Sequence, residues 1–67
     1  MFKIGIDVGG TFTDFVVVRS NEIPRYFKTH STPRDPSEGV LAGLHEVAAA
    51  YDCTPEELLA STELLIH

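Results

Sequence analysis

The 67-residue chain is predicted to form a small α/β unit: a meander of three strands, a covering helix, a short helix and the start of a fourth strand. Three observations predict this class. Residues 2–8 alternate between apolar and other side chains, residues 15–18 are a continuous apolar run, and residues 36–51 place apolar side chains at helical spacing. A chain of this size buries only roughly 60% of its unfolded surface, so we expect residues 1–67 to be one incomplete domain.

The first strand is expected over Phe2–Val8, where the side chains change face at every residue. One face carries Phe2, Ile4, Ile6 and Val8, and the other carries Lys3, Gly5 and Asp7. Gly5 allows a close approach to the second face. Gly9 and Gly10 are expected to end the strand, because glycine reaches positive φ without steric cost.

Two further strands complete the expected antiparallel meander. The β-branched run Phe15–Val18 predicts a central strand that is covered on both faces. Ser20–Glu22 is expected to be a turn, and Ile23–His30 a third strand. Pro24 stands near the start of that strand, where a missing N–H is tolerated.

A helix is expected to begin at Pro36, after the break at residues 32–36. Asp35 is the expected cap, and Glu38 stands at the capping-box position. The side chains expected to cover the sheet are Val40, Leu44, Val47, Ala48 and Tyr51.

The start signal recurs at Thr54–Glu57, which predicts a short second helix after a break at Asp52 and Cys53. Leu64–Ile66 is expected to open a fourth strand. A strand that follows a helix is expected beside an earlier strand through a right-handed crossover.

Composition excludes several classes of protein. The net charge is -5, and all five basic residues lie within residues 1–34, which argues against a nucleic-acid partner. No apolar run approaches the ~20 residues of a membrane span, and the N-terminus lacks the pattern of a signal peptide. We therefore expect a cytoplasmic protein. Cys53 is the only cysteine and is expected to be a small apolar filler.

The glycine turn has the composition of a phosphate-binding loop. Successive amides in such a turn form a concave anion site, and Gly9 and Gly10 let a ligand approach the backbone closely. Thr11 and Thr13 add hydroxyl donors. A plain hairpin with a Gly-Gly turn is the alternative, but it explains neither the threonines nor the neighbouring acids.

Two acids flank this loop. Asp7 ends the first strand and is the expected ligand of Mg²⁺, and Asp14 is a second acid within reach. The loop lacks the lysine of a Walker A motif and the third glycine of a dinucleotide fingerprint. It also leads into a strand, so a helix dipole cannot assist binding.

Two motifs resemble a known family. The stretch Ile4–Asp14 is similar to the first phosphate loop of the ribonuclease H-like, actin/hexokinase/Hsp70-type ATPase fold. Its extended form at residues 5–14, Gly-Ile-Asp-Val-Gly-Gly-Thr-Phe-Thr-Asp, most resembles the N-terminus of the hydantoinase/5-oxoprolinase family. Lys-Thr-His-Ser-Thr-Pro at residues 28–33 is similar to a family strand end, and residues 35–40 resemble the helix start after it. His67 matches the first residue of the His-Gly-Thr-Thr run with which members continue.

The resemblance implies an ATP-dependent hydrolase of cyclic amides such as 5-oxoproline or hydantoins. Asp7 would serve the metal and be the catalytic residue, and Asp14 would be a second metal ligand. The nucleotide phosphates would meet Gly9, Gly10, Thr11 and Thr13. ATP and Mg²⁺ are the implied cofactors, and the substrate and the rest of the nucleotide would be bound by the remainder of the enzyme or by a partner subunit.

Two other functions stay open. The chain also resembles subunits of ATP-dependent acetone and acetophenone carboxylases. A truncated, non-catalytic module that only docks on another chain is an alternative of a different class, because one wall of a cleft cannot enclose ATP. The 67-residue chain alone is expected to be inactive.

The remaining candidates carry weaker signals. His30 ends the third strand near the phosphate side, where a substrate or phosphate contact is conceivable. His45 is expected on the surface of the first helix. Lys28 and Arg34 are expected to be solvated.

Overall fold

The computed structural model describes residues 1–66, which form one four-stranded sheet and two helices. The elements are β1 (Phe2–Val8), β2 (Phe12–Arg19), β3 (Arg25–His30), α1 (Pro36–Ala50), α2 (Pro55–Ala60) and β4 (Thr62–Ile66). The strand order is β3-β2-β1-β4, with β4 parallel to β1 and the other pairs antiparallel. The predicted α/β class, the meander and the crossover are therefore confirmed. His67 lies outside the described residues.

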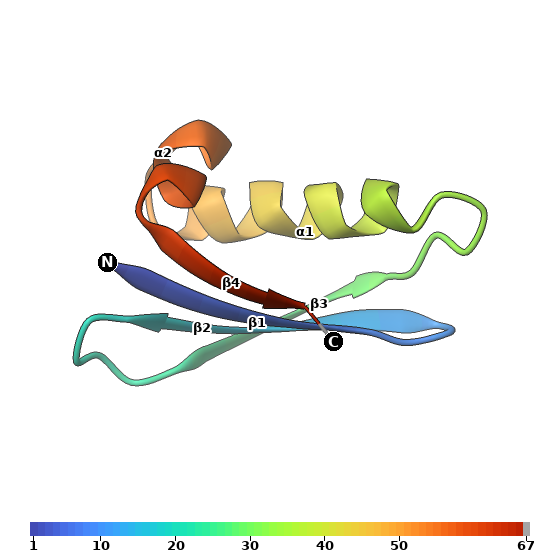
Figure 1. Cartoon of the computed structure of the whole chain (residues 1–67), viewed down its shortest axis with the longest axis horizontal. Coiled ribbons are helices and arrows are strands. Elements are labelled where there is room, and N and C mark those ends of the chain that lie inside the picture. Colours follow the sequence, from blue (N-terminus) through green and yellow to red (C-terminus); the bar gives the residue numbers. More distant parts are fainter. Residues whose placement is uncertain (67) are drawn as a thin grey trace.

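Both helices lie on one face of the sheet (Figure 1). The first strand alternates as predicted, and its apolar side chains enter a core shared with β2, α1 and α2. The buried core consists of Phe2, Ile4, Ile6, Phe15, Val17, Leu44, Val47, Ala48 and Leu58. The predicted apolar stripe of α1 is also confirmed, since its two remaining members, Val40 and Tyr51, are partly buried against this core.

The prediction that the second strand is covered on both faces is wrong for the described residues. Phe15 and Val17 point toward the helices and are buried, whereas Val16 points to the other face and is 37% exposed. A β-branched run identifies a strand, but it does not determine how many of its faces are covered.

Two glycines bring α1 close to the sheet. A Cβ added to Gly43 would lie 2.1 Å from Cζ of Phe15, so the helix rests directly on that ring. A Cβ on Gly39 would lie 3.1 Å from the carbonyl oxygen of His30. These contacts fix the position of the helix over the end of β3.

The predicted cap of the first helix is wrong in its details. Asp35 occupies the N-cap position, but its side chain accepts from the Ser37 hydroxyl (2.6 Å) and makes no cap hydrogen bond. Instead, the hydroxyl of Thr32 donates to the Asp35 carbonyl (2.6 Å) and accepts from the Gly39 amide (2.8 Å). Thr32 makes the contacts that were expected of Asp35, because it reaches into the first turn of the helix from the preceding loop.

The start of the second helix is confirmed. Thr54 Oγ1 accepts from the Glu57 amide (3.1 Å), and the Glu57 carboxylate accepts from the Thr54 amide (2.9 Å), which completes a capping box. Cys53 precedes this helix, half-buried against the core as expected of an apolar filler. Over residues 1–66, neither helix has the length and apolar content needed to cross a membrane.

Candidate functional site

The glycine connection between β1 and β2 forms an exposed hairpin tip of Gly9, Gly10 and Thr11. The Gly9 amide donates to the Phe12 carbonyl (3.0 Å), which closes the hairpin. The expectation of positive φ is wrong, because none of the glycines within the described chain adopts it. Gly9 is needed for space instead: a Cβ there would lie 2.9 Å from the Phe12 carbonyl oxygen.

Ser31 holds this hairpin from the end of β3. Its hydroxyl donates to the Gly9 carbonyl (2.6 Å) and lies 3.0 Å from the Thr13 hydroxyl. Its amide donates to the Thr11 carbonyl (2.8 Å). Sequence reasoning missed this role, although Ser31 belongs to the 28–33 run that carries the family resemblance. Three contacts from one residue thus fix the hairpin's backbone.

These contacts determine where the hairpin's amides point. In a trans peptide the C=O and N–H point in opposite directions, and no cis peptide occurs in the described chain. Because the Gly9 and Thr11 carbonyls face Ser31, the amides of Gly10 and Phe12 face away from it. Within residues 1–66, the amides of Gly10 and Thr11 make no backbone hydrogen bond. A Cβ on Gly10 would meet nothing within 4 Å, so the tip is open on this side.

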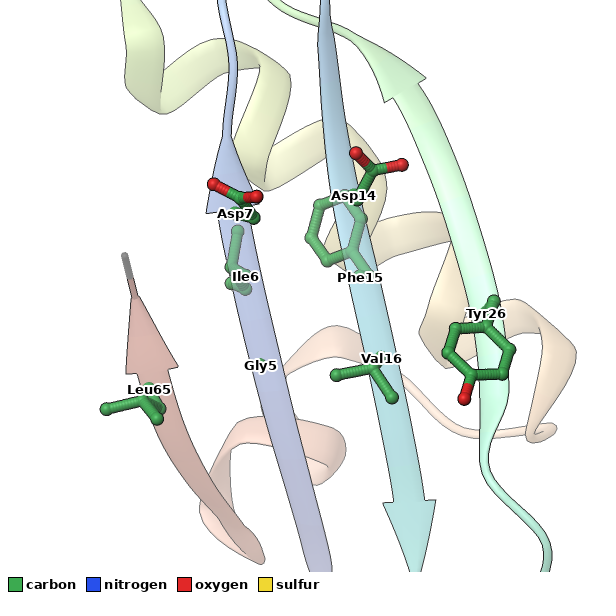
Figure 2. Close-up of a pocket in the computed structure, with 8 residues that line it drawn as sticks. All are labelled: Gly5, Ile6, Asp7, Asp14, Phe15, Val16, Tyr26 and Leu65. Carbon is green, nitrogen blue, oxygen red and sulfur yellow. The ribbon is translucent and has the colours of Figure 1, made fainter.

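The two acids lie together on the sheet face opposite the helices. Asp7 and Asp14 are directly paired across β1 and β2, and both side chains are exposed (Figure 2). Lys28 on β3 places its Nζ 3.7 Å from Asp14 Oδ1, in an exposed ion pair. Like charges directly opposite one another destabilise a strand pair, so this position favours a cation.

The described residues contain no group of three or more His, Cys, Asp or Glu side chains arranged to hold a metal ion. Two carboxylates alone still fit Mg²⁺, which retains several waters and commonly binds through one or two carboxylates together with substrate phosphates. A cation at Asp7 and Asp14 would therefore complete its coordination with water or phosphate oxygens.

The two threonines are separated. Thr11 is exposed at the hairpin tip, whereas Thr13 is 1% exposed and lies on the helix-covered face, where it meets Ser31. The structure therefore brings Gly9, Gly10 and Thr11 together at the exposed tip, whereas it buries Thr13 on the helix-covered face of the sheet.

An aromatic contact lies beside the acids and was not anticipated. The rings of Phe12 and His30 are 5.0 Å apart between centroids, and Lys28 Nζ lies 5.0 Å from the centroid of the Phe12 ring. Lys28 is still exposed, as expected, but it has two partners in Asp14 and Phe12. His45 is exposed on α1.

Comparison with known proteins identifies the family. The family model described as the hydantoinase/oxoprolinase N-terminal region matches residues 3–62. Caprolactamase subunit alpha of Pseudomonas jessenii is 39% identical over 66 residues, which cover 98% of this chain and 10% of that relative. The chain thus spans about a tenth of the length of this curated relative. With the match running from β1 through both helices, the chain belongs to the hydantoinase/oxoprolinase family and corresponds to its N-terminal region.

Proposed function

We propose that this chain is the ATP-phosphate-binding N-terminal region of an ATP-dependent cyclic-amide hydrolase, and part of an actin-like ATPase fold. The observation that carries the proposal is the hairpin tip, whose carbonyls are held by Ser31 and whose Gly10 faces open space. Family membership and the exposed acids beside the tip support it.

The fold of this chain does not explain why position 10 is a glycine, whereas a bound phosphate does. Its φ is not positive, and an added Cβ would have no neighbour within 4 Å. Neither backbone conformation nor internal packing therefore requires glycine here. A phosphate that approached the amide of Gly10 would occupy the space that a side chain at this position would fill.

The residues divide into two roles in this proposal. Gly9, Gly10 and Thr11 line the phosphate, and the Thr11 hydroxyl is free to reorient toward it because it is exposed. Thr13 has an indirect role in this proposal. Its side chain lies on the face opposite the acids, where its hydroxyl contacts the Ser31 hydroxyl that holds the hairpin.

Asp7 and Asp14 would hold Mg²⁺ from the open face of the sheet. When bound, ATP with Mg²⁺ would supply a phosphoryl group whose transfer to the amide oxygen makes the amide carbon a better electrophile. This chain's own part is positioning and charge neutralisation: hairpin amides orient the phosphate oxygens, and the two carboxylates fix the cation.

The relative's name favours amide hydrolysis over ketone carboxylation. Caprolactamase subunit alpha is named for caprolactam, which is a cyclic amide. We propose a substrate of that class, bound by the part of the enzyme that corresponds to the rest of this relative. ATP turnover is accordingly not expected from the 67 residues alone.

The experiment is an NMR titration of the ¹⁵N-labelled chain with magnesium triphosphate, because amide shifts detect binding in the millimolar range. We expect the largest shifts at Gly9, Gly10 and Thr11. Gly10→Val should remove them while keeping the remaining spectrum, since the new side chain meets no neighbour.

Asn21→Val is the matched control, because Asn21 is exposed in the turn at the other end of the sheet. It should leave the titration unchanged. Equal shifts in the Gly10→Val chain, or shifts centred away from the hairpin, would overturn the phosphate assignment. ATP hydrolysis by the purified chain would contradict the proposal that ATP turnover requires the rest of the enzyme.

A further inference from the structure

Lys28 lies beside the two acids, on the side of the sheet that faces away from the helices. Its Nζ is 3.7 Å from Asp14 Oδ1 and 5.0 Å from the centroid of the Phe12 ring. The side chain is 58% exposed, so part of the ammonium group faces solvent. We infer that Lys28 is a further phosphate-binding residue, whose ammonium group leaves Asp14 and contacts the triphosphate when Mg²⁺ occupies the acids. This role rests on the proposed function of the hairpin.

The strand register puts Lys28 in line with both acids. Asp7 pairs with Asp14, and Asp14 pairs with Lys28, so the three residues form a row across β1, β2 and β3. Direct partners in a sheet point to the same face, which Figure 2 shows for Asp7 and Asp14. Gly9 follows Asp7 by two residues, so the tip begins about 7 Å beyond this row. The flexible stem of lysine and the length of a triphosphate together bridge that distance.

Phe12 draws the ammonium group toward the hairpin end of this row. An ammonium group within about 6 Å of an aromatic centroid is attracted to the face of the ring. Phe12 directly follows the tip residue Thr11, and it pairs with His30 across β2 and β3. The rings of Phe12 and His30 are 5.0 Å apart between centroids, and this packing restrains the ring on which Lys28 rests. The charge is thus held beside the phosphate site before any ligand arrives.

Charge and distance determine which partner Lys28 takes. Its contact with Asp14 is too long for a hydrogen bond, so this exposed ion pair contributes little. A divalent cation bound at Asp7 and Asp14 would repel the ammonium group, and a triphosphate would bring several negative charges into the same space. Phosphate oxygens accept charge-assisted hydrogen bonds at short distance. Lys28 therefore exchanges a weak carboxylate contact for a stronger phosphate contact.

The other basic residues of the chain are placed elsewhere. Lys3 and Arg19 lie at the end of the sheet remote from the hairpin, and Arg25 begins β3 at that same end. Arg34 lies in the loop before α1. The hairpin contains no lysine of its own, unlike a Walker A loop. Lys28 is therefore the basic side chain of the sheet that the register places beside the acids.

The test repeats the NMR titration with magnesium triphosphate on two variants that lose the same charge. For Lys28→Gln we expect the Kd to rise about fivefold, the upper size of one exposed charged contact. Lys3→Gln is the matched control and should leave the Kd unchanged, because Lys3 is exposed on the same face at the other end of β1. Lys28→Arg keeps the positive charge and should retain most of the affinity.

A second readout needs no substitution, because the chain contains two lysines, Lys3 and Lys28. With ¹³C-labelled lysine, the Cε–Hε signal of Lys28 should move when magnesium triphosphate is added, whereas the signal of Lys3 should stay in place. Both signals are compared in the same sample, so a general effect of ionic strength would move them together.

The possible results distinguish the role of Lys28 from the proposed function. Absence of hairpin shifts in the unsubstituted chain would overturn both. Hairpin shifts with an unchanged Kd in Lys28→Gln, or with an unmoved Lys28 signal, would overturn the role of Lys28 alone. An equal rise in Kd for Lys28→Gln and Lys3→Gln would show an effect of net charge, and it would also overturn this role.

Discussion

Asp7 on β1 lies directly across from Asp14 on β2, so that two exposed carboxylates share one end of a sheet face. Lys28 contacts one of them, with its Nζ 3.7 Å from Asp14 Oδ1 in an ion pair that is exposed to solvent. Cross-strand neighbours of like charge are destabilising unless something compensates them. A divalent cation held between the two carboxylates would therefore stabilise this strand pair.

Mg²⁺ should raise the Tm of the chain through this pair. Asp14→Asn without metal should change the free energy of unfolding by less than about 1 kcal/mol, because relief of repulsion offsets the loss of an exposed ion pair. The same variant should lose the Mg²⁺-dependent rise in Tm, which circular dichroism measures with and without MgCl₂.

Glu46→Gln is the control for this metal effect, because it removes one negative charge from the exposed side of α1. The rise in Tm should persist in that variant. If both variants lose it equally, Mg²⁺ acts only by screening the net charge of -5.

Ser31→Ala should destabilise the chain by about 1–3 kcal/mol, because it leaves the Gly9 carbonyl and the buried Thr13 hydroxyl short of a partner. Amide hydrogen exchange at Gly9 and at residue 31 should also become faster, since these amides donate to the Phe12 and Thr11 carbonyls and the hairpin loses its anchor. Urea denaturation and exchange measured by NMR check the two effects.

Two variants serve as controls for Ser31→Ala. Ser31→Thr keeps the hydroxyl and should restore slow exchange at the hairpin. Ser37→Ala removes a hydroxyl that contacts only the exposed Asp35 carboxylate, and it should leave the hairpin unaffected. Unchanged exchange in Ser31→Ala would show that the hairpin keeps its conformation without this anchor.

Gly43→Ala should destabilise the fold, although alanine normally stabilises a helix interior by roughly 0.5–1 kcal/mol relative to glycine. The added Cβ would lie 2.1 Å from Cζ of Phe15, so α1 must move away from the sheet. We expect a loss of about 1–3 kcal/mol, as for other overpacked cores, measured by urea denaturation.

Phe15→Leu provides the test of this mechanism, because a smaller side chain leaves room beneath the helix. The double variant should be less destabilised than the sum of the two single changes. Strict additivity would mean that the cost of Gly43→Ala arises somewhere other than at the Phe15 ring.

Thr54→Ala should cost about 1 kcal/mol, because it removes half of the capping box that begins α2. Asp35→Ala should cost clearly less, since the Asp35 side chain makes no cap hydrogen bond to α1. Thermal unfolding of the two variants in parallel gives the comparison. A larger effect at Asp35 would contradict the observed caps.

The strands and helices could be predicted from the sequence because each has a local cause. Alternation placed Phe2, Ile4 and Ile6 on one face, and the helical stripe containing Leu44 and Val47 was identified from spacing alone. The Thr54 signal was correct because both partners of a capping box lie within four residues.

The errors concern contacts that depend on the path of the backbone through a loop, a hairpin or a strand pair. Thr32 replaced Asp35 in the first turn of α1 because the preceding loop folds back onto the helix. Gly9 is required by the nearby Phe12 carbonyl and not by its own φ. Ser31 meets the hairpin only after β3 pairs with β2, so no local pattern pointed to its contacts with Gly9 and Thr13.

Ser31 follows β3, which is an edge strand of the sheet as described, and it anchors the glycine hairpin that joins β1 and β2 at the same end of the sheet. Edge strands open more readily than central ones, because they are paired on one side only. Whenever β3 frays from β2, the tip would lose its fixed shape at the same moment. A molecule that clamps the outer edge of β3 would therefore stiffen the hairpin at a distance, without touching it.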